Sequence, residues 1–65
     1  MNTDIIKGNW KEIKGKVKQQ WGKLTDDDLQ QIDGKREELV GKIQAQYGYA
    51  REQAEEEVKR WEDSY

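Results

Sequence analysis

The sequence contains no cysteine, no histidine, no proline and no phenylalanine. Without cysteine, the chain has no disulfide bond, no thiolate metal ligand and no cysteine nucleophile. Without histidine, it lacks the commonest metal ligand and the side chain that usually moves protons near neutral pH. Any general base would have to be Asp, Glu, Lys or Tyr, so the sequence offers little from which to build an active site.

Long apolar stretches are also missing, and the mean hydropathy is −1.33. A membrane-spanning helix needs about 20 mostly apolar residues, and a signal peptide needs an apolar segment of roughly 7–15. We therefore expect no membrane partner and, as the default, a cytoplasmic location. The length of 65 residues predicts a single domain, residues 1–65, of marginal stability.

Charge is abundant but unevenly distributed. Residues 1–24 hold six lysines against two acids, a balance of +4, whereas residues 25–65 hold six basic and twelve acidic residues, a balance of −6. Few large aliphatic residues would indicate disorder if the net charge were also large, but the net charge is only −2. The composition therefore predicts a folded chain with a basic N-terminal third and an acidic remainder.

An internal repeat relates the two halves of the chain. A shift of 26 residues aligns GNWKEIKGKVKQQWGKL, from Gly8, with GKREELVGKIQAQYGYA, from Gly34. The apolar positions match as well as the glycines, which indicates an approximate internal duplication. The six glycines form two triplets with a spacing of seven: Gly8, Gly15 and Gly22, and Gly34, Gly41 and Gly48.

Apolar residues recur at intervals of three and four, which is the pattern of one helix face and not of a strand. The pattern predicts an all-α chain with four short helices near residues 9–21, 25–33, 35–47 and 50–63. They would form two packed helical hairpins, at about 9–33 and 35–63. The inward-facing residues are expected to be Ile6, Trp10, Ile13, Val17, Trp21, Leu24, Leu29, Ile32, Leu39, Val40, Ile43, Tyr47, Ala50, Ala54, Val58, Trp61 and Tyr65.

The tryptophans and glycines each have two interpretations. Trp10, Trp21 and Trp61 fit a hydrophobic core, because aromatic side chains bury much area, although a stacking role is the alternative.

Gly22 follows the first helix as a C′ residue does. Gly15 and Gly41 lie mid-helix, where glycine costs roughly 0.5–1 kcal/mol relative to alanine. They either allow a close approach or keep the helices near the edge of stability.

Three consecutive aspartates follow Thr25. As a helix start, Thr25 is the N-cap, Asp28 occupies N3 in a variant of the capping box, and Asp26 and Asp27 meet the positive end of the helix dipole. As a calcium site, the run would need acids at alternate positions around a glycine turn. Consecutive acids on a helix splay apart, so the sequence favours capping. By the same reasoning, the run at 55–57 reads as a solvated helix face.

Motifs for catalysis and nucleotide binding are missing. Neither glycine-rich phosphate-binding pattern occurs, and Gly15-Lys16 and Gly41-Lys42 fall inside predicted helices. Ser64 is the only serine and lies at the end of the last helix. We expect no enzyme activity, no catalytic or metal-binding residues and no cofactor.

Lysines form a stripe along one flank of the first helix. Their spacing of four, three and four residues places Lys7, Lys11, Lys14 and Lys18 on one face, beside the apolar stripe. The plainer interpretation is a solvated flank; the alternative is weak, nonspecific contact with nucleic acid phosphates. Without arginine, the stripe is poorly suited to reading bases.

Several of these residues resemble the signature of the CsbD-like family: Asn9-Trp10, Lys14-Gly15, Lys18, Gly22 and Thr25-Asp26. The similarity continues through the second glycine triplet and the Glu-rich last helix with Trp61. The resemblance implies a small hydrophilic bacterial protein associated with general stress responses. It also implies two orthogonally packed hairpins of the SAM-domain-like type, and no catalytic residues.

Two functional hypotheses follow from the sequence. The first is a non-enzymatic stress-response protein with a protective or interaction role, since a very hydrophilic surface resists aggregation. The second is a binding module that contacts nucleic acid or a protein partner through the basic first helix. In either case we expect a monomer or a weak dimer.

Overall fold

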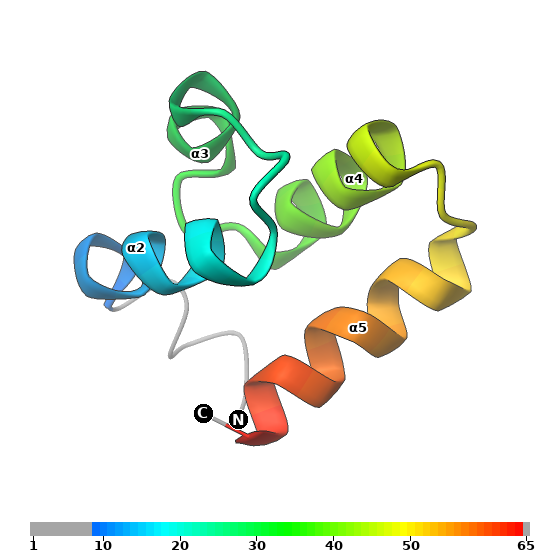
Figure 1. Cartoon of the computed structure of the whole chain (residues 1–65). Coiled ribbons are helices and arrows are strands. Elements are labelled where there is room, and N and C mark those ends of the chain that lie inside the picture. Colours follow the sequence, from blue (N-terminus) through cyan, green and yellow to red (C-terminus); the bar gives the residue numbers. More distant parts are fainter. Residues whose placement is uncertain (1–8, 65) are drawn as a thin grey trace.

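The computed structural model describes residues 9–64, which form four α-helices (Figure 1). These are α2 (Trp10–Gln20), α3 (Asp26–Ile32), α4 (Arg36–Tyr47) and α5 (Arg51–Ser64). No strand occurs in this part of the chain. The all-α prediction is confirmed, and each helix begins and ends within one residue of its expected position.

The hydrophobic core draws on all four helices and on the turn between α2 and α3. Trp10, Tyr47, Tyr49 and Trp61 are partly buried against it. The fully enclosed set matches the inward face expected from the three- and four-residue spacing. The core consists of Ile13, Val17, Trp21, Leu24, Leu29, Ile32, Leu39, Val40, Ile43, Ala54 and Val58.

Three residues that the sequence predicts in the core are not found there in the described structure. Ile6 and Tyr65 lie outside the described residues. Ala50 was expected to face inward but is exposed, because it precedes α5 and is not part of it. Its carbonyl accepts the hydrogen bond from the Ala54 N–H at 3.0 Å, so Ala50 starts the helix instead of filling the core.

Helix α4 packs against both α3 and α5 (Figure 1). It therefore joins the first half of the chain to the last helix. Matched positions of the repeat agree in part: Val17 and Ile43 are both enclosed, but Trp21 is buried where Tyr47 is only partly so. The SAM-domain-like arrangement of the hairpins and the internal duplication stay predictions.

The two turn glycines differ in backbone conformation. Gly48 ends α4 in the left-handed region, with φ of 72°, as a C′ glycine usually does. Gly22 follows α2 as expected, but it is not among the described residues with positive φ. The α2–α3 turn is closed instead by the Leu24 N–H, which donates to the Trp21 carbonyl at 3.0 Å. Gly22 therefore does not need its conformational freedom in the way Gly48 does.

Candidate functional site

The aspartate run starts α3. The Asp28 N–H donates to Thr25 Oγ1 at 3.1 Å, and the Thr25 N–H donates to Asp28 Oδ2 at 3.0 Å, which completes the capping box. Asp26 and Asp27 are exposed in the first turn of the helix. Nowhere in residues 9–64 do three or more acidic side chains gather as metal ligands would. The capping interpretation is thus confirmed.

Asp28 also connects α3 to α4, which sequence reasoning missed. Gln46 Nε2 donates to its Oδ2 at 3.3 Å, and Lys42 Nζ lies 3.7 Å from its Oδ1. The pKa of Asp28 is lowered from its ordinary value of 3.8, chiefly by the hydrogen bond from the Thr25 N–H. Burial opposes this shift, and the charge of Lys42 adds to it. The signal in the sequence was a lysine and a glutamine four residues apart on α4, but it does not identify their partner.

A second buried carboxylate connects α4 to α5. Glu62 is only 4% exposed, and Arg36 Nε donates to its Oε1 at 3.2 Å and its Oε2 at 3.3 Å. By contrast, the 55–57 acidic run is exposed or partly exposed, as expected for a solvated face. Sequence reasoning did not distinguish Glu62 from those neighbours.

The buried polar groups are therefore used to hold helices together. Asp28 and Glu62 are the buried charged residues of the described chain, and each has at least one partner on another helix. No buried side-chain nitrogen or oxygen in residues 9–64 lacks a hydrogen bond. This part of the chain thus offers no buried carboxylate free to act as an acid or base.

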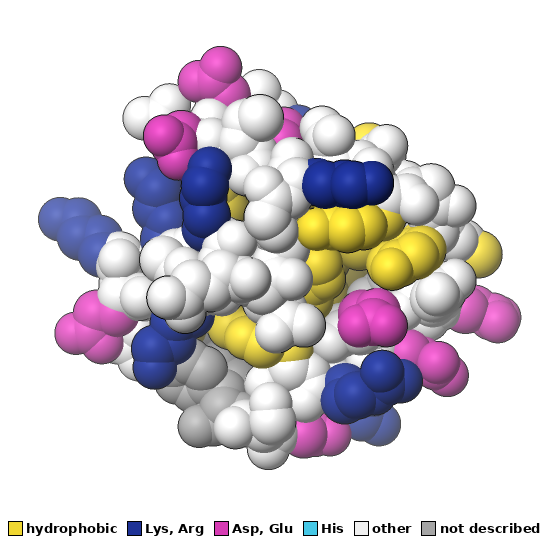
Figure 2. Space-filling model, in the orientation of Figure 1, with side chains coloured by type: hydrophobic (Ala, Val, Ile, Leu, Met, Phe, Trp, Pro, Cys, Tyr) yellow, Lys and Arg dark blue, Asp and Glu magenta, His cyan; other side chains and the backbone are white. Residues whose placement is uncertain are grey.

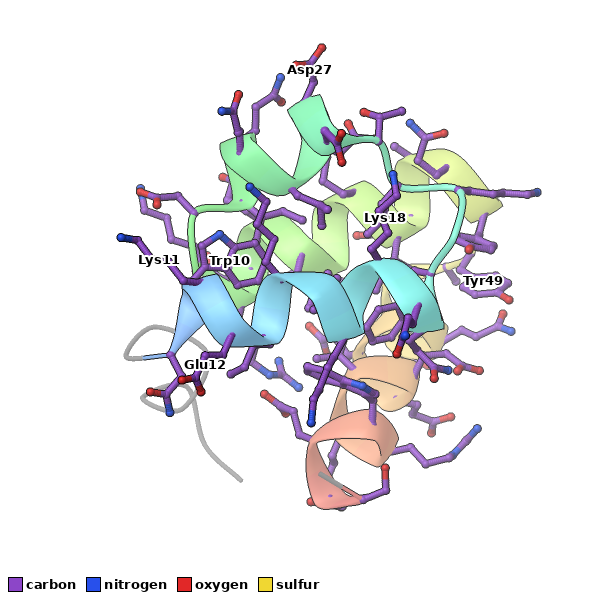
Figure 3. All side chains as sticks on the ribbon, turned by 60° about the vertical axis from the view of Figure 1, so that its left-hand side comes forward. Trp10, Lys11, Glu12, Lys18, Asp27 and Tyr49 are labelled. Atoms are coloured by element: carbon purple, nitrogen blue, oxygen red, sulfur yellow. The ribbon has the colours of Figure 1, made fainter. Side chains whose placement is uncertain are left out.

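The predicted lysine stripe divides into residues with different roles. Lys18 binds the α2–α3 turn: its Nζ donates to the Leu24 carbonyl at 3.3 Å and to Asp26 Oδ1 at 3.4 Å (Figure 3). Lys11 and Lys14 have no hydrogen-bond or ion-pair partner among the described residues. Lys7 lies outside the described residues. Of the four lysines in the stripe, Lys11 and Lys14 therefore have no partner in the described chain, whereas Lys18 binds the α2–α3 turn.

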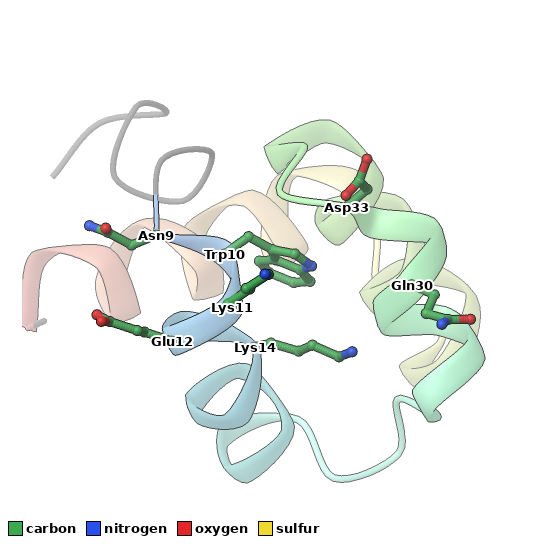
Figure 4. Close-up of a pocket in the computed structure, with 7 residues that line it drawn as sticks. All are labelled: Asn9, Trp10, Lys11, Glu12, Lys14, Gln30 and Asp33. Atoms are coloured by element: carbon green, nitrogen blue, oxygen red, sulfur yellow. The ribbon is translucent and has the colours of Figure 1, made fainter.

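Lys11 and Lys14 border a surface groove of about 720 Å³ between α2 and α3 (Figure 4). From the α2 side, the groove is lined by Asn9, Trp10, Lys11, Glu12 and Lys14, and from the α3 side by Gln30 and Asp33. The Trp10 ring projects between the two helices, with Lys11 beside it, and the side chain of Glu12, another lining residue, points away from the ring (Figure 4). Sequence reasoning had placed Trp10 beside the lysines but had not found the wall formed by α3.

The three tryptophans differ in role. Trp21 is 3% exposed and meets Trp61 edge-on, with ring centroids 5.5 Å apart, so the core interpretation is confirmed for Trp21. Trp61 is partly buried at the edge of the core. Trp10 packs against the core and also lines the groove, so it combines the two interpretations considered for the tryptophans.

A second aromatic area lies between the two turns. The rings of Tyr47 and Tyr49 stack with centroids 5.5 Å apart, and Lys23 Nζ lies 5.1 Å from the centre of the Tyr47 ring. The Lys23 N–H also donates to the Tyr47 hydroxyl at 3.3 Å. These contacts join the α2–α3 turn to the end of α4, which is a structural use of the tyrosines.

Charged side chains of both signs are scattered over the face seen in Figure 2, mainly toward its edges, and hydrophobic side chains gather in a smaller area nearer its middle. None of the helices in residues 9–64 has the length and apolar character needed to cross a bilayer.

Comparisons with known proteins identify the family. The family model described as CsbD-like matches residues 4–56. The UPF0337 protein ECA0631 of Pectobacterium atrosepticum is 65% identical over 65 residues, which is all of this chain and 94% of that relative. The UPF0337 protein YjbJ of Escherichia coli (strain K12) is 66% identical over 62 residues, covering 95% of this chain and 90% of the relative.

A more distant relative extends the same match. The UPF0337 protein PA4738 of Pseudomonas aeruginosa is 57% identical over 63 residues and is covered to 97%, as is this chain. The family model spans most of the sequence, and these relatives match nearly all of it, so the chain belongs to the CsbD-like family.

Proposed function

We propose that this protein is a non-enzymatic stress-response protein of the cytoplasm, whose folded, highly charged surface protects other macromolecules or contacts them weakly. Family membership supports the association with stress. The charged residues, 40% of the chain, support the protective role, because such surfaces hold water and resist association.

One observation carries the non-enzymatic part of the proposal. Both buried carboxylates of the described chain, Asp28 and Glu62, are bound by residues of another helix. Catalytic carboxylates usually face a substrate cleft, whose surroundings shift their pKa toward the pH at which the enzyme works. Asp28 departs in the other direction, because its contacts lower its pKa and keep it charged.

The test is a drying experiment on a labile enzyme. The enzyme is dried and rehydrated with this protein, or with an equal mass of an unrelated small globular protein of similar net charge. The proposal predicts a higher fraction of retained enzyme activity with this protein across several mass ratios. Equal retention with both proteins would count against a protective role.

The alternative function is a binding module for nucleic acid or for a protein partner. It is favoured by the two lysines of the groove that lack partners in the described chain, Lys11 and Lys14. SAM-domain-like folds host both activities, which is an analogy from the expected fold alone. Retention on immobilised DNA at about 20 mM salt, lost steeply as salt is raised, is the expected behaviour of this alternative.

A further inference from the structure

We propose that the groove between α2 and α3 binds single-stranded nucleic acid, with one base stacked on Trp10 and the neighbouring phosphates bound by Lys11 and Lys14. This inference rests on the alternative function above and specifies its site, its residues and the form of its ligand. It does not depend on the protective role.

The first support is the state of the two lysines. Lys11 is exposed and Lys14 partly exposed, and both side chains line the groove. Most other basic side chains of the described chain are used within the fold: Lys18 at the turn, Lys42 with Asp28, and Arg36 with Glu62. Lys11 and Lys14 therefore offer two cations on adjacent turns of one helix that are available to an anion.

The second support is the aromatic ring that lines the same groove as these lysines. Trp10 is partly buried, so its packing against the core fixes the ring while the rest of it lines the groove (Figure 4). A fixed aromatic ring in a groove that also carries cations is the arrangement with which proteins bind single strands, because every base has a π-face and every nucleotide a phosphate. A duplex hides its base faces, so the same groove could contact only its backbone.

The two acids near the groove constrain the path of the strand. Glu12 lines the groove, but its side chain points away from the Trp10 ring (Figure 4). Asp33 lies on the α3 side, where its carboxylate repels phosphate. The phosphates are therefore expected to follow the α2 wall, past Lys11 and Lys14, with the base directed toward Trp10.

The test measures fluorescence anisotropy of a short labelled deoxythymidine strand with the full chain at about 20 mM salt. Lys11→Gln with Lys14→Gln is expected to weaken binding by about tenfold or more and to reduce the salt slope of log K by about 1.4, for two phosphate contacts. The matched control is Lys59→Gln with Arg60→Gln, which removes the same charge from α5, outside the groove. It should weaken binding no more than about twofold at this salt.

Two further variants separate the roles of the groove. Trp10→Leu keeps an apolar side chain against the core and is expected to weaken strand binding by about tenfold, through loss of stacking. Asp33→Asn keeps a residue type that tolerates the left-handed backbone found there, φ of 45°, and is expected to tighten binding about two- to threefold. Damage to the fold cannot produce that gain.

The outcomes are distinguishable. No anisotropy change with DNA or RNA strands at about 20 mM salt would overturn the inference together with the nucleic-acid form of the alternative function. If the groove and control variants lost the same amount of binding affinity, the binding would be nonspecific attraction between charges and the groove would not be the site. Equal affinity for duplex and single strand would lead to the same conclusion. Thymidine monophosphate and unlabelled strand are also compared as competitors at the same concentration of nucleotide. If the two compete equally well, the groove binds a mononucleotide and not a strand.

Discussion

Asp28 makes contacts with three other residues of the described chain. It completes the cap of α3 with Thr25 and reaches across to Lys42 and Gln46 of α4. A single carboxylate thereby fixes both the start of one helix and its position against the next.

The lowered pKa of Asp28 makes its contribution to stability depend on pH. Because the pKa is lower in the folded than in the unfolded chain, ionised Asp28 stabilises the fold above its unfolded value of about 3.8. That contribution is lost as the pH falls through the folded pKa. We therefore expect Asp28→Asn to be less stable than the wild type near neutral pH, and the difference to shrink as the pH falls below 3.8.

Urea denaturation at a series of pH values measures this difference. Asp27→Asn is the control, because it removes an exposed carboxylate from the same first turn without the contacts to α4. Its effect should be smaller than that of Asp28→Asn at neutral pH. A gap between wild type and Asp28→Asn that stayed constant down to about pH 2.5 would contradict the assignment.

Within the helices, the two mid-helix glycines are sites of low intrinsic stability. A Cβ added at Gly15 or Gly41 would meet nothing within 4 Å in the described chain. Close packing is therefore not the reason for glycine at either position. Gly15→Ala and Gly41→Ala are each expected to raise the free energy of unfolding by about 0.5–1 kcal/mol, and to add because they lie on different helices.

Gly48→Ala is the control for that experiment. Its backbone φ of 72° is one that a side chain rarely adopts, so this substitution is expected to destabilise by about 1 kcal/mol or more, although there is space around it. Thermal or urea unfolding of the three variants gives the answer. A Gly15→Ala, Gly41→Ala double variant that unfolded more readily than the wild type would mean that these glycines face a neighbour.

The Arg36–Glu62 pair is a polar contact between α4 and α5. Glu62 is buried, so a charge-assisted hydrogen bond there contributes more than one at the surface. Glu62→Gln is expected to lower the free energy of unfolding by about 1–3 kcal/mol, and a double-mutant cycle with Arg36→Met should give a clear coupling energy.

The exposed pair Arg51–Glu55 is the matched comparison. Its N···O distance is 2.9 Å, shorter than that of the buried pair, but it lies along one helix surface. Glu55→Gln should cost only about 0.3–0.5 kcal/mol. Similar losses for Glu62→Gln and Glu55→Gln would show that burial does not set the value of the α4–α5 pair.

For the molecule as a whole, helix positions could be read from the sequence, and the contacts between helices could not. The three- and four-residue spacing and the Thr25 cap depend on neighbours in the chain, so they predicted the helices to within one residue. The partners of Asp28 and Glu62 depend on how α4 crosses α3 and α5. In sequence, Glu62 is one of many acids on α5, and only the packing of that helix directs it toward Arg36.

The groove between α2 and α3 was half predictable for the same reason. The lysine spacing and the neighbouring Trp10 are properties of α2 alone. The wall formed by Gln30 and Asp33, and the use of Lys18 at the turn, require the chain to fold back after Leu24. The residue spacing along one helix therefore predicted a basic flank of four lysines. The structure places two of them, Lys11 and Lys14, in the groove.

If the folded, non-catalytic surface carries the function, an unfolded form of nearly the same chain should lose it. Val17 is fully buried, so Val17→Asp places a charge in the core and should unfold so small a domain. Gln19→Asp makes the same change of charge at an exposed position of the same helix. Circular dichroism first checks that only Val17→Asp is unfolded.

The measurement is the fraction of activity that a labile enzyme retains after drying with each variant at equal mass. We predict that Gln19→Asp protects as well as the wild type and that Val17→Asp loses most of the protection. Equal protection by both variants would mean that composition alone protects the enzyme and that the fold is not required.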